Sequence, residues 1–270
     1  MLRSMIATKY SRKRVAMKAD VVLKSLCENS SLEYDLPSAR ANWMSVGELL
    51  KNWEQILSAY QNYLGTRTIE PAAACAAQHY SGRWVPVILA LWWKTGKILD
   101  CSHGIWFADI DERGATLSVR CSKPRFISFG DEGELLSTLV EHLRDIANFS
   151  LTQSRLISDV VWGSMAASLA GGLSTIVRSH KVQDRDFAID KAIRLLRTKS
   201  PLTYGKHGWL IDPYVVEGSD GKRLAFLRTT CCLIHLGHYR CEQCPNRPEA
   251  ERAESSKKYE LQASRTIPIK

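Results

Sequence analysis

The sequence predicts a helix-rich α+β fold with a small antiparallel sheet and a C-terminal cysteine loop (residues 229–245). Three observations support this prediction. Apolar residues recur at helical spacing over several long stretches. Between these stretches the pattern changes to short β-type runs separated by glycine turns. Four of the eight cysteines then fall within fourteen residues near the C-terminus.

The first half of the chain is predicted to be mainly helical. Apolar residues at helical spacing predict a helix over 46–64, and Gly65 is its natural end. Glu70-Pro71 opens an alanine-rich helix over 70–80. We expect Gly82 to break this helix, so that residues 85–93 form a separate buried helix.

The second half is predicted to alternate between strands and helices. Residues 104–109 and 115–120 are expected to form a hairpin, because Asp111–Gly114 supplies a turn with glycine. The next expected elements are a strand over 126–129 and helices over 133–148, 154–170 and 184–198, the second of them ended by Gly171-Gly172. Two last strands, over 204–216 and 223–227, are joined by the turn Gly218–Gly221 and lead to the cysteines.

These elements suggest four parts of the chain. Residues 1–40 are an N-terminal extension of mixed polarity, and residues 41–200 form the main body. Residues 201–247 contain the last strands and the cysteine loop, and residues 248–270 are expected to be a solvated polar tail because they have little to bury.

Composition and charge narrow the class of protein. Hydrophobic residues make up 45% and charged residues 24% of the 270 residues, as in ordinary globular proteins. The formal charge of +9 raises the question of nucleic acid, but Arg12–Arg14 is the only compact basic run, so no nucleic-acid partner is expected. No secretory signal is visible, and the longest apolar run, Trp84–Trp93, is too short to span a bilayer. We therefore expect a cytoplasmic protein without a transmembrane segment.

The cysteine cluster indicates a metal or iron–sulfur site. Cys231-Cys232 and Cys241-x-x-Cys244 provide thiolates, the usual ligands of iron–sulfur clusters and structural zinc. Adjacent side chains on a regular strand point to opposite faces, so both thiols of the first pair reach one small ion only with a local distortion. A cluster with two iron ions is wider than a single ion, so two adjacent thiols can approach it more easily. This favours a [2Fe–2S] cluster. The spacing is also unlike the usual C-x2-C-x2-C runs of [4Fe–4S] sites.

Zinc is the alternative. His235 and His238 lie between the two cysteine pairs, and with Cys241, Cys244 or Cys232 they would complete a tetrahedral site. Mixed thiolate and imidazole ligation of a cluster, as in Rieske centres, is a further possibility. The colour of the purified protein separates these cases, because a [2Fe–2S] protein is red-brown and a zinc protein is colourless.

The segment Thr229–Pro245 resembles the C-terminal signature of the ferric siderophore reductases, the FhuF-like family. That family ends in C-C-x10-C-x2-C, and its four cysteines correspond to Cys231, Cys232, Cys241 and Cys244. Here eight residues, not ten, separate the two pairs. Ala72–Pro86 is similar to the family's alanine-rich helix, and Val161–Ala170 is similar to its Trp-Gly-Asn helix, with Ser164 in place of the Asn.

This resemblance, which extends from about residue 40 to residue 247, implies an oxidoreductase. A [2Fe–2S] cluster on the four cysteines would pass one electron to siderophore-bound Fe(III) and release Fe(II). The implied substrate is a ferric hydroxamate or hydroxamate–citrate siderophore, bound by the body of the protein. No glycine signature for a nucleotide is visible, so the electron is expected from a separate ferredoxin or flavoprotein.

Four residues are candidates for substrate contact: Arg83, Trp84, Trp162 and Arg228. The first two follow the expected break at Gly82, and Trp162 lies near a helix start. Arg228 precedes the cysteine pair, where its charge would raise the reduction potential of an anionic cluster. Beyond the cluster no catalytic residue is expected.

The remaining cysteines are expected to be isolated buried thiols without a role in the centre: Cys27, Cys75, Cys101 and Cys121.

Two other functions are compatible with the sequence. One is a zinc-stabilised binding module, suggested by the mixture of histidine and cysteine. The other is an iron–sulfur electron carrier or redox sensor without a substrate pocket. A body of this size is larger than a carrier needs, which favours a bulky substrate.

Overall fold

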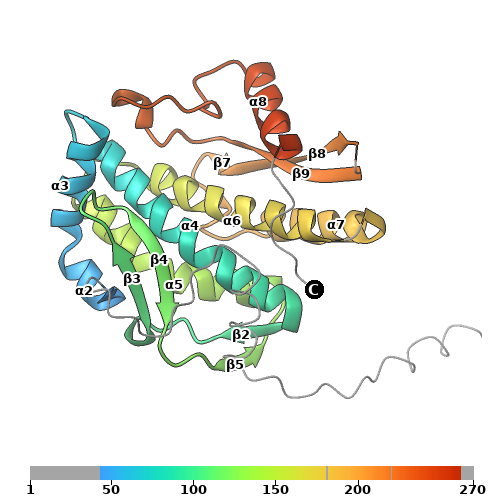
Figure 1. The fold of residues 1–270 in the computed structure, drawn as a ribbon, viewed down its shortest axis with the longest axis horizontal. Helices are drawn as coiled ribbons and strands as arrows, with labels where there is room; N and C mark the ends of the chain where they lie inside the picture. The colour runs from blue at the N-terminus through green and yellow to red at the C-terminus, as the bar shows by residue number, and fades with distance from the viewer. Residues whose placement is uncertain (1–42, 181, 220, 263–270) are drawn as a thin grey trace, which may run out of the picture.

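The computed structural model describes residues 43–180, 182–219 and 221–262. The expected α+β class is confirmed, since long helices combine with several small antiparallel sheets (Figure 1). The expected extension over residues 1–40, with Cys27, lies outside the described residues. The helices are α2 (Val46–Lys51), α3 (Trp53–Leu64), α4 (Glu70–Thr95), α5 (Glu132–Thr152), α6 (Ser158–Ser179), α7 (Arg185–Arg197) and α8 (Glu249–Gln262). Short 3-10 turns are η1 (His103–Ile105), η2 (Val182–Asp184) and η3 (Ile234–Leu236).

The strands form four small antiparallel sheets. In chain order the strands are β1 (Trp43–Ser45), β2 (Lys97–Leu99), β3 (Trp106–Ile110), β4 (Thr116–Cys121), β5 (Phe126–Phe129), β6 (Tyr204–Gly205), β7 (Gly208–Trp209), β8 (Ile211–Gly218) and β9 (Gly221–Arg228). They pair as β1-β3-β4, β2-β5, β6-β7 and β8-β9.

Helices α4 and α6 run side by side through the centre of the fold (Figure 1). Small residues let them approach closely. A Cβ added at Gly172 would lie 2.9 Å from the Leu89 side chain of α4, and Ser81 Oγ lies 2.9 Å from Ser168 Oγ across the interface. The distance between packed helices depends on the side chains at the contact. This interface therefore sets the position of everything that packs on either helix.

Two expected helix ends inside this pair are wrong. Helix α4 continues past Gly82 with Pro86 inside it, and α6 continues through Gly171-Gly172. Proline and glycine oppose helix formation, glycine by about 1 kcal/mol per residue. Nearly all apolar residues on both sides of these positions are buried. Tertiary packing therefore outweighs the local preference.

The helix expected over 46–64 is instead two helices, α2 and α3. Asn52 separates them with φ −98° and ψ 13°, and its side-chain Nδ2 donates a 2.8 Å hydrogen bond to the carbonyl of Glu48. Asparagine side chains compete in this way for backbone groups and interrupt helices.

The two expected hairpins are confirmed, but the strand expected over 204–216 is wrong as a single element. It is divided into β6, β7 and β8, because β6 and β7 fold back on each other at a tight turn in which Gly208 has φ 123°. β3 and β4 pair around a turn in which Gly114 has φ 78°, and β8 and β9 pair with Gly218 opposite Gly221. Residues 126–129 do form a strand, β5, which pairs with β2 rather than with β4. The core is continuous across these parts, since Ile211, Leu224 and Cys232 belong to the same buried cluster as α4 and α6.

The polar tail expected after residue 248 is wrong for residues 249–262, which form α8. This helix packs on β9 (Figure 1), and Ser256 Oγ donates a 3.1 Å hydrogen bond to the carbonyl of Phe226. Glu260 is 2% exposed and pairs with Arg178 of α6. Polar anchors therefore hold α8, and a hydrophobic pattern does not predict it.

Helix α6 is long and apolar enough to cross a membrane by length and composition alone. Of its most apolar window, 78% is buried inside the fold. A buried core helix passes the same test, so the expected absence of a transmembrane segment stays a prediction.

A buried histidine organises the region between α4, α5 and the small sheets. The His142 ring stacks on Trp84 with centroids 3.8 Å apart. Its Nδ1 lies 2.6 Å from the carbonyl oxygen of Cys101, and its Nε2 lies 2.7 Å from the hydroxyl of Tyr80. A carbonyl only accepts, so Nδ1 carries the proton and Nε2 accepts from Tyr80. Burial lowers the pKa of His142 to about 3, and the ring is neutral.

This burial predicts a pH dependence of stability. In the unfolded chain the pKa of His142 returns to about 6.5, whereas in the fold it is about 3. The unfolded chain therefore binds the additional proton first. We expect the contribution of His142 to the free energy of unfolding to be complete above about pH 6.5. It should be lost as the pH falls toward the folded pKa, by at most about 1.4 kcal/mol per pH unit.

Urea unfolding between about pH 7.5 and about pH 5 measures this slope. The variant His142→Gln should be less stable at the upper pH and should lose stability less steeply. Parallel pH profiles of the two proteins would contradict the assignment.

Candidate metal centre

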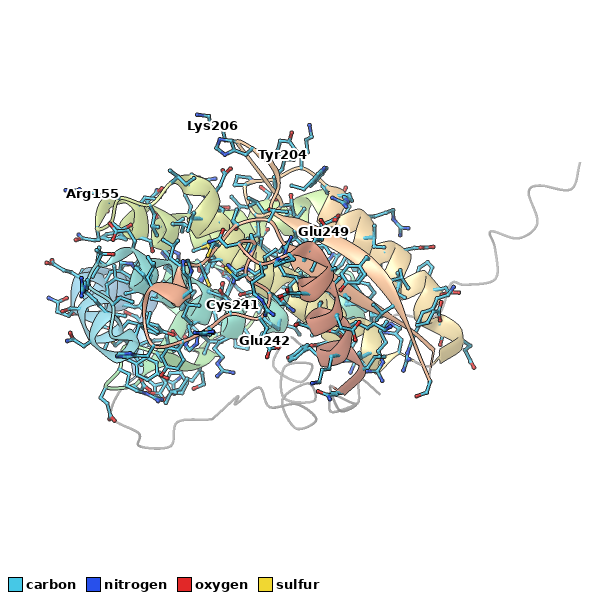
Figure 2. The ribbon with its side chains drawn as sticks, turned by 90° about the horizontal axis from the view of Figure 1, so that it is seen from above. Arg155, Tyr204, Lys206, Cys241, Glu242 and Glu249 are labelled. Atoms are coloured by element: carbon cyan, nitrogen blue, oxygen red, sulfur yellow. The ribbon has the colours of Figure 1, made fainter. Side chains whose placement is uncertain are left out.

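Hydrogen bonds to backbone carbonyls hold the cysteine loop at its start and in its middle. At its start, Thr229 Oγ1 donates a 2.7 Å hydrogen bond to the carbonyl of Trp209. In its middle, the amide of His238 donates to the carbonyl of Leu64 at the end of α3, 3.0 Å away. Figure 2 labels Cys241 and Glu242 on the part of the loop that precedes α8. The loop thus bridges β9, α3 and α8.

The four cysteines of the loop sort into two pairs. Cys231 Sγ lies 3.5 Å from Cys244 Sγ, and the thiols of Cys232 and Cys241 are hydrogen-bonded to each other. Two thiolates on one tetrahedral ion bound at about 2.3 Å would lie roughly 3.8 Å apart. The pair of Cys231 and Cys244 therefore has the spacing of two ligands on one metal ion.

One imidazole joins the first pair. The ligand atoms of Cys231, His235 and Cys244 all lie within 4.8 Å of one another, and this group could hold a metal ion. His235 Nδ1 is 3.5 Å from Cys231 Sγ. His238 instead lies against the backbone of Gly65, where a Cβ would be 1.9 Å from its Nε2. Of the two histidines considered for zinc, only His235 is in this group.

The backbone after the cysteine pair departs from a strand. Leu233 has φ 61°, and among the described residues it is the one non-glycine residue with positive φ. Its amide donates a 3.3 Å hydrogen bond to Cys231 Sγ. A left-handed residue with a side chain costs about 1–2 kcal/mol. The chain therefore leaves the extended conformation directly after the cysteine pair.

The thiols differ in acidity. Hydrogen bonds from Cys241 and Cys75 lower the pKa of Cys232, and the charge of Arg228 adds to this effect. Burial raises the pKa of Cys231 to about 11. Metal ions bind thiolate, not thiol. Cys232 is therefore more acidic than Cys231 and Cys241, whose thiols must lose protons when a metal ion binds.

Cys75 was expected to be an isolated thiol, and this is wrong. It lies on α4 against Cys232, with its Sγ 3.9 Å from the Cys232 carbonyl oxygen and its thiol hydrogen-bonded to that of Cys232. Sequence spacing cannot show a contact across 157 residues. The only hint is the run of alanines around Cys75, which allows another segment to approach. Cys101 and Cys121 are buried near each other, as expected of structural thiols.

Arg228 lies beside the thiols, as expected, but inside the protein rather than on its surface. It is 4% exposed. Its Nη1 donates to Gln78 Oε1 at 3.0 Å, and its Nη2 donates to Ser164 Oγ at 3.2 Å. Its Nε has no hydrogen-bond partner, and no carboxylate within the described ranges pairs with it. A buried charge is costly unless it is paired. An anionic metal–thiolate centre would supply the missing negative charge.

The first two expected substrate contacts lie elsewhere. Trp84 is 0% exposed and stacks on His142 in the core, so the expectation that it contacts a ligand is wrong. That expectation depends on a helix break at Gly82, and α4 continues through this residue. Arg83 is exposed, and its Nε lies 3.4 Å from the carbonyl oxygen of Thr116 on β4. A role for Arg83 in binding stays a prediction.

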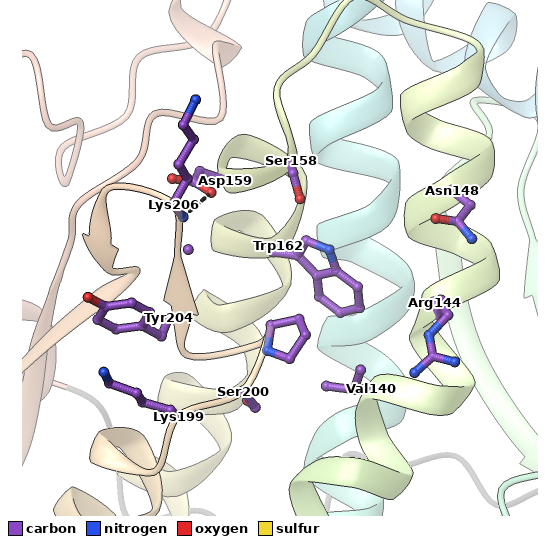
Figure 3. A pocket seen from close by; sticks show the side chains of 12 residues that line it. Val140, Arg144, Asn148, Ser158, Asp159, Trp162, Lys199, Ser200, Tyr204 and Lys206 are labelled. Carbon is purple, nitrogen blue, oxygen red and sulfur yellow. Dashed lines mark hydrogen bonds between the residues drawn. The ribbon is translucent and has the colours of Figure 1, made fainter.

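Trp162 lines a groove of about 640 Å³ between α5, the start of α6 and the segment 199–206. Figure 3 shows its indole between Arg144 on one side and Ser200 on the other. Arg144, Lys199 and Lys206 make the groove basic. The carboxylate of Asp159 is occupied by the amides of Lys206 and His207. The expected exposure of Trp162 to a ligand is thus compatible with this groove, although no cysteine lines it.

The buried charge of Arg228 leads to a prediction about metal affinity. Arg228→Gln keeps hydrogen-bonding groups but removes the charge. It should weaken Co(II) binding to the reduced, metal-free protein about tenfold or more, because a charge–charge interaction across a partly buried distance is lost. Competition with a chelator, followed by the thiolate-to-cobalt absorption, measures this. Arg197→Gln, at a partly exposed arginine paired with Asp212, is the matched control, and equal affinities in the two variants would contradict the role of Arg228.

The position of Cys75 leads to a second prediction. Cys75→Ala should leave metal loading intact, because Cys75 belongs to neither ligand pair. It should shift the thiolate-to-metal absorption bands, since it removes a hydrogen bond to the Cys232 sulfur. Cys101→Ala, an equally buried thiol, should leave the spectrum unchanged. If Cys75→Ala abolishes metal binding, Cys75 is a ligand rather than a neighbour.

No family model matches the chain, and no curated protein matches its sequence. The chemistry of the site is therefore inferred from its own residues. What the structure supports directly is a group of cysteines and one histidine that could hold a metal ion.

Proposed function

We propose that this protein is an iron–sulfur oxidoreductase that reduces siderophore-bound Fe(III) to Fe(II). A [2Fe–2S] cluster would be held by Cys231, Cys232, Cys241 and Cys244. The observation that carries the proposal is the sorting of these thiols into two close pairs beside a buried guanidinium without a carboxylate partner.

The donor set fits a centre with two metal ions better than one with a single ion. Four ligands on one ion would all lie within about 4 Å of one another. Here Cys231 and Cys244 form a close group with His235, and Cys232 and Cys241 stand outside it. Two pairs of thiolates around a wider core are the usual ligand arrangement of [2Fe–2S] clusters.

The four cysteines and Arg228 would have different roles in the centre. Cys232 and Cys244 are buried, at 4% and 5% exposed, and limit the access of water. Cys231 and Cys241 are partly exposed and provide an edge for electron exchange. Arg228 offsets negative charge, and a nearby cation favours the reduced, more negative state of such a centre. When bound, a [2Fe–2S] cluster supplies single electrons.

The reaction we propose has one substrate ion and one electron. Fe(III) in a hydroxamate or hydroxamate–citrate siderophore gains the electron and becomes Fe(II). Oxygen ligands hold the softer Fe(II) less well, so the iron is released. A ferredoxin or flavoprotein would replace the electron, since no nucleotide-binding glycine motif is present. The process would take place in the cytoplasm, where thiols stay reduced.

A second candidate is a zinc-stabilised binding module. The 3.5 Å approach of His235 Nδ1 to Cys231 Sγ favours it, because zinc accepts mixed cysteine and histidine ligands. In that case Cys231, His235 and Cys244 would be three of the four ligands. A carrier or redox sensor would instead keep the cluster without using a substrate site.

Purification without oxygen, after growth in ample iron, tests the proposal. The protein should be red-brown and contain about two irons and about two sulfides per chain, as a [2Fe–2S] cluster requires. Cys244→Ser should lose the colour, and Cys121→Ser is the matched control. Stoichiometric zinc in place of iron would contradict the cluster and favour the binding module.

The reaction itself is tested with protein reduced by dithionite, which is then removed. Mixed with a ferric trihydroxamate and a ferrous trap, the protein should be reoxidised and yield about one Fe(II) for each electron it held. Reoxidation should stop in the Cys244→Ser variant. A stable reduced protein in the presence of hydroxamate and citrate-type substrates would favour a carrier or sensor.

A further inference from the structure

A cavity of about 410 Å³ lies against the cysteine loop, between α6, β9 and α8. Cys241 lines it directly, together with Arg228, which reaches toward the thiols. Ligand cavities in proteins are commonly about 300–1,000 Å³. The cavity is therefore large enough for part of a chelate and is in contact with a proposed ligand of the metal centre.

Small residues of α6 leave space along one side of the cavity. Gly171 lines it, and a Cβ added there would meet nothing within 4 Å. Ala167, one turn earlier, lines the same space. Helix interiors normally avoid glycine, which costs about 1 kcal/mol relative to alanine. The glycine thus preserves a space that a larger side chain would fill without a clash.

Two of the charged groups around the cavity already pair with each other. Arg178 pairs with the buried Glu260 and also bonds the hydroxyls of Ser174 and Thr175. Arg228 faces the thiols, and Glu242 adds a negative charge at the loop. Polyanions would be repelled by a thiolate centre next to them. The side-chain amides of Gln78 and Gln243 also line the cavity and provide donors, so an uncharged ligand with oxygen acceptors fits best.

We propose that this cavity binds the ferric chelate on which the protein acts, as an uncharged, oxygen-rich complex placed against Cys241. The inference rests on the proposed function and adds the site and the charge of the substrate. The electron that reduces Fe(III) to Fe(II) comes from the centre beside Cys241, and the donor protein replaces it. No covalent bond forms, and the chelator keeps its oxygens as Fe(II) leaves.

The basic groove at Trp162 is the competing site. It is larger, and its three cations suit a polyanion. In Figure 2, Tyr204 and Lys206 of that groove lie at the upper edge, apart from Cys241 and Glu242. No cysteine lines the groove. Direct contact with the centre therefore favours the cavity at Gly171.

The variant Gly171→Leu tests the site by filling it. Leucine is a better helix former than glycine, so the fold should persist, and circular dichroism with urea unfolding checks this. Gly47→Leu is the matched control, because Gly47 is also a helical glycine with open space, on α2 away from the cavity. The probe is the gallium(III) complex of a neutral cyclic trihydroxamate, which binds like the iron complex but accepts no electron.

Calorimetry should show that the native protein and Gly47→Leu bind the gallium complex alike, and that Gly171→Leu binds it at least about tenfold more weakly. Equal binding to Gly171→Leu, or no binding to the native protein, would overturn the inference. Tighter binding of gallium citrate, lost in Arg144→Glu but kept in Lys258→Glu, would assign the substrate to the groove and overturn it as well. Binding that follows the expected pattern, without Fe(II) formation from the iron complex, would uphold the site and reject the proposed reaction.

Discussion

The close packing of α4 on α6 is the constraint on which the rest of the structure depends. The alanines, serines and glycines at the interface bring the two backbones together. One end of the pair holds Gln78 of α4 and Ser164 of α6, which both bind the guanidinium of Arg228. A wider interface would separate these groups and leave the arginine unsupported. The small residues at the contact between α4 and α6 thus set the position of the candidate metal centre.

The same interface explains why a charged group is tolerated inside. Arg228 loses its hydration and regains only two hydrogen bonds to neutral groups. Such an arrangement normally costs several kcal/mol unless an opposite charge is present. Thiolates formed at Cys232 and its neighbours on metal binding would supply that charge. A metal ion that binds the thiolates would therefore also stabilise the buried arginine.

The features that the sequence predicted are those whose cause is local. Gly114 and the Gly218–Gly221 turn determine hairpins by themselves. Four cysteines close in sequence are also close in space.

The features that the sequence missed depend on distant contacts. Pro86 stays in a helix because its surroundings are buried. Helix α8 forms because Glu260 meets Arg178 from another helix. Cys75 reaches the centre because α4 passes beneath the loop. No pattern within a short window contains these partners, whereas each is evident once the helices are placed.

The attachment of the cysteine loop to α3 has a consequence for biosynthesis. The amide of His238 binds the carbonyl of Leu64, and Gly237 packs on the same carbonyl. Cys75 and Gln78 are also supplied by an early segment. During translation, the thiol of Cys75 and the side-chain amide of Gln78 therefore stay uncovered until the C-terminal half of the chain has left the ribosome. A metal ion would then bind only after the two halves have met, because a ribosome-bound chain that ends before residue 231 has none of the four cysteines of the loop.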